Sequence, residues 1–164
     1  MKRYISLLFI CGAVFVAPLT SFAAVDAKSD RLSLAVVSAR CHVPTKAKVA
    51  ALFERWNNSL RTGDPAEVAA NYADDAVLLP TLSKEVRHTQ KQREDYFRDF
   101  LKKKPVGHID GRTIRTGCNK AIDTGTYTFS FGDGSKANAR YTFTYVWNGK
   151  DWLISSHHSS TVPH

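Results

Sequence analysis

The sequence predicts an α+β fold, with helices in the first half of the chain and an antiparallel sheet in the second half. Between residues 45 and 101, apolar side chains recur at spacings of three and four, the period of an amphipathic helix. From residue 107 onward the period changes to two, and turn signals at residues 132–135 and 148–149 separate the alternating segments. Helices that precede such a sheet are expected to cover one of its faces.

Three helices are expected before the sheet. Thr45 is a candidate N-cap for the first helix, whose apolar stripe consists of Val49, Leu52, Phe53, Trp56 and Leu60. Asp64 and Pro65 begin a short second helix, because an acidic cap followed by proline is typical of a helix start. Thr89 and Gln92 form a capping box for the third helix, which is expected to end at the lysines of residues 102–104.

Five strands complete the prediction. A buried strand is expected over residues 76–79, after a turn at Asp74 and Asp75. Four strands linked by hairpins are expected over residues 107–117, 121–131, 139–147 and 152–160. Alternation within these strands places aromatic residues on one face and threonines on the other.

The first 23 residues have the pattern of a secretory signal peptide. Lys2 and Arg3 form a basic start, an apolar run covers residues 4–17, and the small residues Ser21 and Ala23 stand three and one positions before the expected cut. We expect cleavage after residue 23, with residue 24 as a near alternative. The apolar run is short for a membrane span. The chain is therefore expected to be exported, either to the periplasm or as a secreted protein, without a membrane span in its mature form.

Residues 24–43 are expected to form a leader held by Cys41, ahead of one domain over residues 44–164. Removal of the signal leaves Cys41 and Cys118, and an even pair in an oxidising compartment predicts a disulfide. The alternative is two separate buried thiols. In the chain-entropy model, a bridge across roughly 78 residues contributes about 4 to 5 kcal/mol.

The net charge of +8 over 164 residues raises the question of a nucleic-acid partner. Loss of residues 1–23 leaves 21 basic and 15 acidic residues, a net charge of +6 that is spread along the chain. The one basic run, residues 102–104, has an explanation as a helix end, where positive charge complements the helix dipole. We therefore expect no nucleic-acid partner.

Several segments carry a family resemblance. They are residues 52–57, 62–65, 72–80, 100–105, 123–129, 139–143 and 152–160. Over residues 47–163 the chain resembles the nuclear transport factor 2-like superfamily. It is most similar to the association (hub) domain of calcium/calmodulin-dependent protein kinase II and its stand-alone bacterial relatives, which border on the SnoaL-like proteins. The resemblance implies a cone-shaped, curved antiparallel sheet with three helices on its concave face and a pocket between them.

The resemblance also directs attention to possible site residues. The candidate ligand-binding residues are Trp56, Tyr72, Arg87, Tyr127, Arg140, Tyr145 and His157, and the candidate catalytic residues are His157 and Asp123. The kinase hub lines its pocket with arginines from the last strands. This chain has Ser159 at the equivalent end, with Arg140 as the nearest basic candidate.

Each candidate has a structural alternative. Adjacent strand residues point to opposite faces, so only one of His157 and His158 can enter the pocket. The resemblance favours His157, with the other on the outer face where such domains dimerise. His157 could carry a proton or simply be a hydrogen-bonded structural histidine. Asp123 could join it as an acid–base pair or be satisfied by backbone amides.

Arg87 and Arg140 could bind an anion through two parallel hydrogen bonds, or pair with nearby carboxylates such as those of Asp74, Asp75 and Asp123. The aromatic candidates are mostly expected in the core, and some of them could also form walls of an apolar pocket. One histidine per face gives too few converging ligands for a metal site, so neither a metal nor another cofactor is expected.

The sequence thus predicts an exported, hub-like domain that forms a homodimer or larger ring and binds a small anionic or apolar molecule. One alternative is an enzyme of the SnoaL or ketosteroid-isomerase type that uses His157 or Asp123 for proton transfer. A second alternative is a purely structural oligomerisation module. No kinase-like segment is found before the domain, so calmodulin-dependent phosphorylation is not expected.

Overall fold

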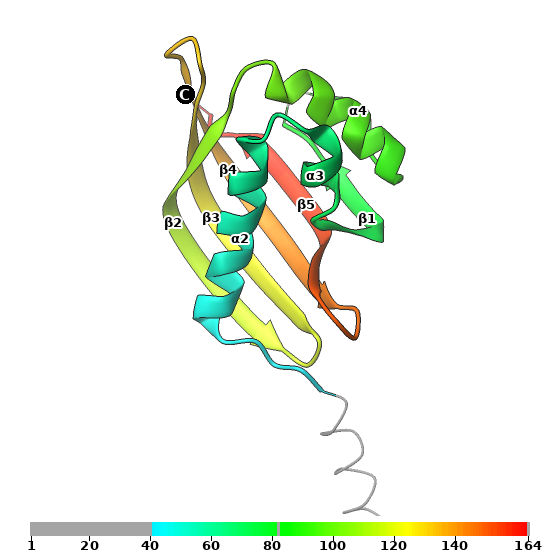
Figure 1. The fold of residues 1–164 in the computed structure, drawn as a ribbon. Coiled ribbons are helices and arrows are strands. Elements are labelled where there is room, and N and C mark those ends of the chain that lie inside the picture. The colour runs from blue at the N-terminus through cyan, green and yellow to red at the C-terminus, as the bar shows by residue number, and fades with distance from the viewer. Residues whose placement is uncertain (1–40, 82, 164) are drawn as a thin grey trace, which may run out of the picture. The chain divides into compact units, whose positions relative to one another are not determined.

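The computed structural model describes residues 41–81 and 83–163, and the elements follow the predicted order (Figure 1). The helices and strands are α2 (Lys46–Leu60), α3 (Pro65–Ala69), β1 (Tyr72–Leu79), α4 (Gln90–Leu101), β2 (Val106–Gly117), β3 (Lys120–Ser130), β4 (Lys136–Trp147) and β5 (Trp152–Thr161). The predicted signal peptide and most of the predicted leader lie outside the described residues. Among the helices that are described, none is long and apolar enough to span a membrane.

The five strands form one curved, open sheet in the order β1-β5-β4-β3-β2. The pairings of β2 with β3, β3 with β4, and β4 with β5 are antiparallel, whereas β1 runs parallel to β5. Helices α2, α3 and α4 lie on the same face of the sheet (Figure 1). The predicted α+β fold is therefore confirmed, with its strands from the second half of the chain covered by helices from the first.

Local capping signals account for the three helix starts. The Thr45 side chain accepts a hydrogen bond from the Lys48 backbone N–H at 3.1 Å. Asp64 caps α3 in the same way, and Thr89 and Gln92 form the predicted capping box at the start of α4. Each cap satisfies backbone donors that the first turn of a helix leaves without partners.

The predicted turn at Asp74 and Asp75 is wrong. Both residues lie inside β1, which begins at Tyr72 and shifts its register against β5 between Tyr72 and Val77. A bulge of this kind accommodates extra residues within a strand, and both aspartates remain exposed there. Sequence composition alone suggested a turn because aspartates are common in turns.

The apolar stripe of α2 packs against the inner face of the sheet. All five of its predicted residues are buried, with Phe53 and Trp56 each 1% exposed. The rings of both residues contact that of Phe143 on β4, at centroid distances of 6.0 and 5.4 Å. This aromatic contact fixes α2 across the middle strands and forms the central part of the core.

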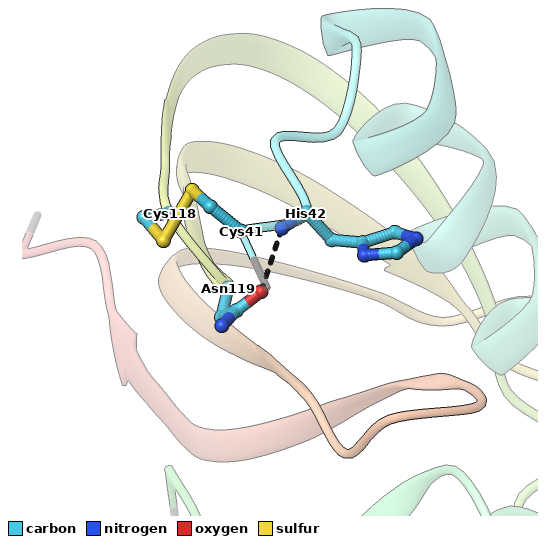
Figure 2. Close-up of a disulfide and its surroundings, with 4 residues drawn as sticks. All are labelled: Cys41, His42, Cys118 and Asn119. Atoms are coloured by element: carbon cyan, nitrogen blue, oxygen red, sulfur yellow. Dashed lines mark hydrogen bonds between the residues drawn. A yellow bond between two sulfur atoms is a disulfide. The ribbon is translucent and has the colours of Figure 1, made fainter. Parts of the chain in front are cut away.

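The predicted disulfide joins Cys41 to Cys118 and is confirmed (Figure 2). It ties the segment before α2 to the turn between β2 and β3, residues that are 77 positions apart. The neighbouring backbone N–H of His42 donates to Asn119 Oδ1 at 2.8 Å (Figure 2), and the His42 ring stacks on Trp147 at 4.5 Å. The start of the domain is thus held by covalent, polar and aromatic contacts together.

A bulge in β2 changes which residues face the helices. The pairing of β2 with β3 shifts between Ile109 and Gly111, so that Arg112 is partly buried where simple alternation would turn it outward. The bulge brings the two backbones very close together, since a Cβ atom on Gly125 would lie 1.9 Å from the carbonyl oxygen of Gly111. Only glycine fits at position 125.

This close approach predicts a selective effect of substitution. Gly125→Ala should lower the free energy of unfolding by at least about 2 kcal/mol, because the strands must separate to accept the methyl group. Gly117→Ala is the matched control on the same strand pair, since its Cβ would meet no atom nearer than 3.9 Å. Urea denaturation measures both variants, and equal stabilities would contradict the proposed steric role of Gly125.

Candidate functional site

A cavity of about 450 Å³ lies among α4, the segment after β1, and the inner faces of β3, β4 and β5. Its aromatic and aliphatic lining consists of Trp56, Leu78, Pro80, Tyr96, Phe97, Phe100, Phe129, Phe131, Ala137 and Ala139. Its polar lining consists of Thr81, Tyr127, Asn138, His157, Ser159 and Thr161, and its charged lining of Arg87, Asp95, Asp99 and Lys103. This volume and this mainly apolar surface are typical of a small-molecule site.

His157 is held by a buried chain of hydrogen bonds. Trp56 Nε1–H donates to Tyr72 Oη at 3.1 Å, and Tyr72 Oη lies 2.9 Å from His157 Nδ1. Because the Trp56 N–H can only donate, the arrangement that satisfies all three groups has the Tyr72 hydroxyl donating to Nδ1. The proton of the neutral imidazole is then on Nε2.

The second nitrogen of His157 remains available to the cavity. Nε2 is buried and has no hydrogen-bond partner among the described residues. Burial lowers the pKa of His157 to about 3, with a smaller contribution from the neighbouring His158. Burial also raises the pKa of Tyr72 well above its usual value, so the phenol keeps its proton. The cavity therefore contains a neutral imidazole that presents an unused N–H donor.

Three hydroxyl groups form a second polar element. Tyr127 Oη donates to Ser159 Oγ at 2.6 Å, and Thr81 Oγ1 donates to the same oxygen at 2.5 Å. Ser159 Oγ thus accepts two hydrogen bonds, which leaves its own proton free to be donated. Because burial raises the pKa of Tyr127, its phenol stays protonated. We refer to His157, Ser159, Tyr127 and Thr81 as the polar end of the cavity.

Most charged side chains of the lining are already paired. The ion pairs are Arg87–Glu85 at 2.5 Å, Asp95–Lys91 at 2.8 Å, Asp95–Arg98 at 2.6 Å and Asp99–Lys102 at 2.6 Å. Hydrogen bonds from these partners lower the pKa of Asp95 and of Asp99, so both carboxylates are ionised at neutral pH. Arg87 Nε is buried without a hydrogen-bond partner among the described residues.

Asp123 belongs to a separate polar cluster. Its Oδ1 accepts hydrogen bonds from Tyr141 Oη at 2.9 Å and from Arg112 Nε at 3.2 Å. Burial raises the pKa of Asp123, while Tyr141 and Arg112 oppose this shift. Phe143 on β4 pairs with Asp123 on one side and with His157 on the other. Two strand spacings, roughly 10 Å, therefore separate the two candidate catalytic residues, and they do not form an acid–base pair.

The predicted ligand-binding residues divide into three groups. Trp56, Arg87, Tyr127 and His157 line the cavity. Tyr72 lies behind His157 and orients it, whereas Tyr145 is buried in the core outside the cavity lining. Arg140 is exposed and is paired in register with Thr126 and Ser160. Its neighbour Tyr141 faces inward, so alternation along β4 turns Arg140 away from the cavity.

Other important residues lacked a clear sequence signal. Thr81 lies in the irregular segment after β1, and nothing in the local pattern indicates its contact with Ser159, 78 positions away. Arg112 is brought to Asp123 by the bulge in β2, for which the only sequence signals are Gly111 and Gly125. Several residues of α4 line the cavity because the packed helix lies beside it, and the sequence of the helix does not indicate that position.

The arrangement is suited to recognition by hydrogen-bond donation. The polar end offers a neutral imidazole N–H and hydroxyl protons, surrounded by aromatic rings. His157 is poorly placed as a general base, because the Tyr72 hydroxyl donates to Nδ1 and the one proton of the neutral imidazole therefore lies on Nε2. Asp95 and Asp99 are the carboxylates of the described lining, and both are engaged by basic side chains of α4 and its C-cap. Among the described residues no three His, Cys, Asp or Glu side chains gather as a metal site.

Burial of His157 predicts a specific pH dependence of stability. In the unfolded chain its imidazole takes up a proton below about pH 6.5, whereas the native imidazole does not until about pH 3. The native state is therefore destabilised as the pH falls through this range. Between about pH 7 and about pH 5, the free energy of unfolding should fall by about 2 kcal/mol more in the wild-type protein than in His157→Gln. The other histidines are common to both proteins and cancel in this comparison. Urea unfolding at the two pH values measures this difference. An equal fall of the unfolding free energy in both proteins would rule out a buried neutral His157.

Comparison with known proteins places this geometry in a family context. The sequence family described as the calcium/calmodulin dependent protein kinase II association domain matches residues 45–163 of this chain. No curated protein matches the chain. A solved structure of a calcium/calmodulin dependent protein kinase II association domain from Xanthomonas campestris is 48% identical, with a TM-score of 0.71. That match covers 74% of this chain and 90% of the other.

More distant structures share the fold. A nuclear transport factor 2-like protein of unknown function from Pseudomonas putida is 20% identical, has a TM-score of 0.63, and matches over 70% of this chain and 84% of its own. A protein with a cystatin-like fold from Caulobacter vibrioides is 18% identical, has a TM-score of 0.59, and matches over 70% and 87%. The family model and the Xanthomonas structure together cover the whole described α+β domain from its first helix to its last strand. The chain belongs to the calcium/calmodulin dependent protein kinase II association domain family.

Proposed function

We propose that this domain binds a small, largely apolar molecule in its cavity through an acceptor atom that meets His157 Nε2–H. The observation that carries the proposal is this buried N–H, which has no partner among the described residues. Leaving such a donor unsatisfied is costly, and a ligand acceptor would remove that cost. The aromatic rings around it favour a flat, apolar ligand body.

The same observations give less support to the alternatives. An enzyme that moves protons needs a group that can accept one, and the described cavity offers a protonated Nε2 and carboxylates engaged in ion pairs. A purely structural module would be expected to fill its interior, because protein cores are close-packed. The cavity of about 450 Å³ favours ligand binding over that alternative.

We also propose that the domain self-associates through the outer face of its sheet. The family is described as an association domain, which supports self-association. On the outer face, Thr124, Thr142 and Thr144 place small side chains around the exposed Ile122. The exposed Leu79 lies farther along the same face, on the other side of His158. A sheet face with short side chains can approach a second copy closely. Export remains part of this proposal, and the disulfide supports it because such bonds persist in oxidising compartments.

Ligand binding can be tested with aromatic probes and a matched pair of variants. An aromatic compound with one acceptor group, 2-acetonaphthone or 2-naphthoate, should bind the wild-type protein with 1:1 stoichiometry in isothermal titration calorimetry. His157→Phe should weaken binding about tenfold, since it removes the N–H donor. His158→Phe is the control, because His158 is exposed on the opposite face. Failure of both compounds to bind, or equal losses in both variants, would contradict the proposal.

Self-association can be tested by light scattering after size-exclusion chromatography. The wild-type protein should elute as a dimer or larger ring, and Ile122→Asp should shift it toward the monomer by introducing a charge into the proposed interface. Val43→Asp is the control, since Val43 is also an exposed aliphatic residue but precedes α2. A wild-type monomer at high concentration, or dissociation by both variants alike, would rule out the outer-face interface.

A further inference from the structure

Resting on the proposed function, we propose that the cavity selects a neutral carbonyl compound with an aromatic or alicyclic body over the carboxylate of the same shape. The argument concerns charge. An anion that leaves water for an apolar cavity needs a compensating cation, whereas a ketone needs only hydrogen-bond donors. The donors at the polar end of the described lining are uncharged, and the charge of Arg87 is matched by Glu85.

The donors at the polar end are uncharged. His157 presents Nε2–H from a neutral imidazole. Burial keeps the ring from taking up a second proton, and the hydrogen bond from Tyr72 to Nδ1 places the one proton on Nε2. Ser159 accepts hydrogen bonds from Tyr127 and Thr81, so its own hydroxyl proton is left to be donated. These groups suit the lone pairs of a carbonyl oxygen but supply no net charge to balance a carboxylate.

Arg87 supplies the guanidinium of the lining, but Glu85 already pairs with it. The Glu85 carboxylate lies 2.5 Å from Arg87 Nη1, and Arg87 Nη2 donates to Ser83 Oγ at 3.2 Å. Two of the five N–H groups of Arg87 are therefore engaged, and the Glu85 carboxylate balances the charge of the guanidinium. The buried Nε–H has no hydrogen-bond partner among the described residues, so Arg87 can donate to a carbonyl oxygen while Glu85 balances its charge.

The remaining charges of the lining do not favour an anion. Asp95 and Asp99 are ionised carboxylates of the lining, and Lys91, Arg98 and Lys102 already pair with them. Lys103 also lines the cavity, but its Nζ lies 5.9 Å from the centre of the Phe131 ring, where it makes a cation–π contact. The described lining residues thus carry two positive and two negative charges. None of these charges belongs to the polar end, whose four residues supply hydrogen-bond donors and no cation for an anion.

The test compares three probes of the same ring system: naphthalene, 2-acetonaphthone and 2-naphthoate. Their dissociation constants are measured with the wild-type protein at neutral pH, where the naphthoate is ionised. The ketone should bind at least tenfold more tightly than the naphthoate, and more tightly than naphthalene because of its acceptor. A naphthoate that binds as tightly as the ketone overturns this inference but leaves the proposed function standing. If none of the three probes binds, both this inference and the proposed function are overturned.

A second measurement tests the role of Glu85 directly. Glu85→Gln removes the counter-charge of Arg87, so the preference for the ketone over the naphthoate should fall at least threefold. Glu54→Gln, on the exposed side of α2, removes one negative charge elsewhere and should leave the preference unchanged. A preference that is the same in Glu85→Gln as in the wild type would overturn the argument from charge pairing.

Discussion

The hydrogen-bonded chain from Trp56 through Tyr72 to His157 is the constraint on which the rest of the structure depends. It joins α2 and β1 to β5, at the other end of the described chain, inside an otherwise aromatic core. Trp56 also packs against Phe143 and Phe97, so the donor that begins the chain is fixed by the core itself. The position of the helix over the sheet and the protonation of His157 are consequently set by the same contacts.

The hydrogen bonds among Trp56, Tyr72 and His157 explain how a polar group can be kept inside an apolar cavity. Tyr72 satisfies one side of the imidazole and leaves the other side for a ligand. Charged side chains around the lining are likewise paired with other protein groups. Glu85 forms an ion pair with Arg87, and basic residues of α4 form ion pairs with Asp95. The cavity can therefore recognise an acceptor by hydrogen bonding while contributing little net charge.

Much of the fold could be predicted from local patterns in the sequence. The caps at Thr45 and Thr89 and the alternation along β3 and β4 are local signals, and the structure confirms them. The same alternation indicated that Arg140 and Tyr141 occupy opposite faces, so the proposed ligand contact of Arg140 conflicted with a pattern already visible. Asp74 and Asp75 were misassigned because a bulge absorbs them inside β1.

The sequence by itself determined the order of helices and strands, their caps, the disulfide pair and the faces of the regular strands, because each follows from residue types at short spacing or from a single pair of cysteines. Only the tertiary structure decided the partners of His157 and Asp123 and the inward position of Arg112. The contact of His157 with Tyr72 depends on the pairing of β1 with β5, which are far apart in the sequence, and the position of Arg112 depends on the bulge in β2. A shift of one residue reverses the face of every side chain that follows. Long-range register is set by packing of the complete core, which no local pattern records.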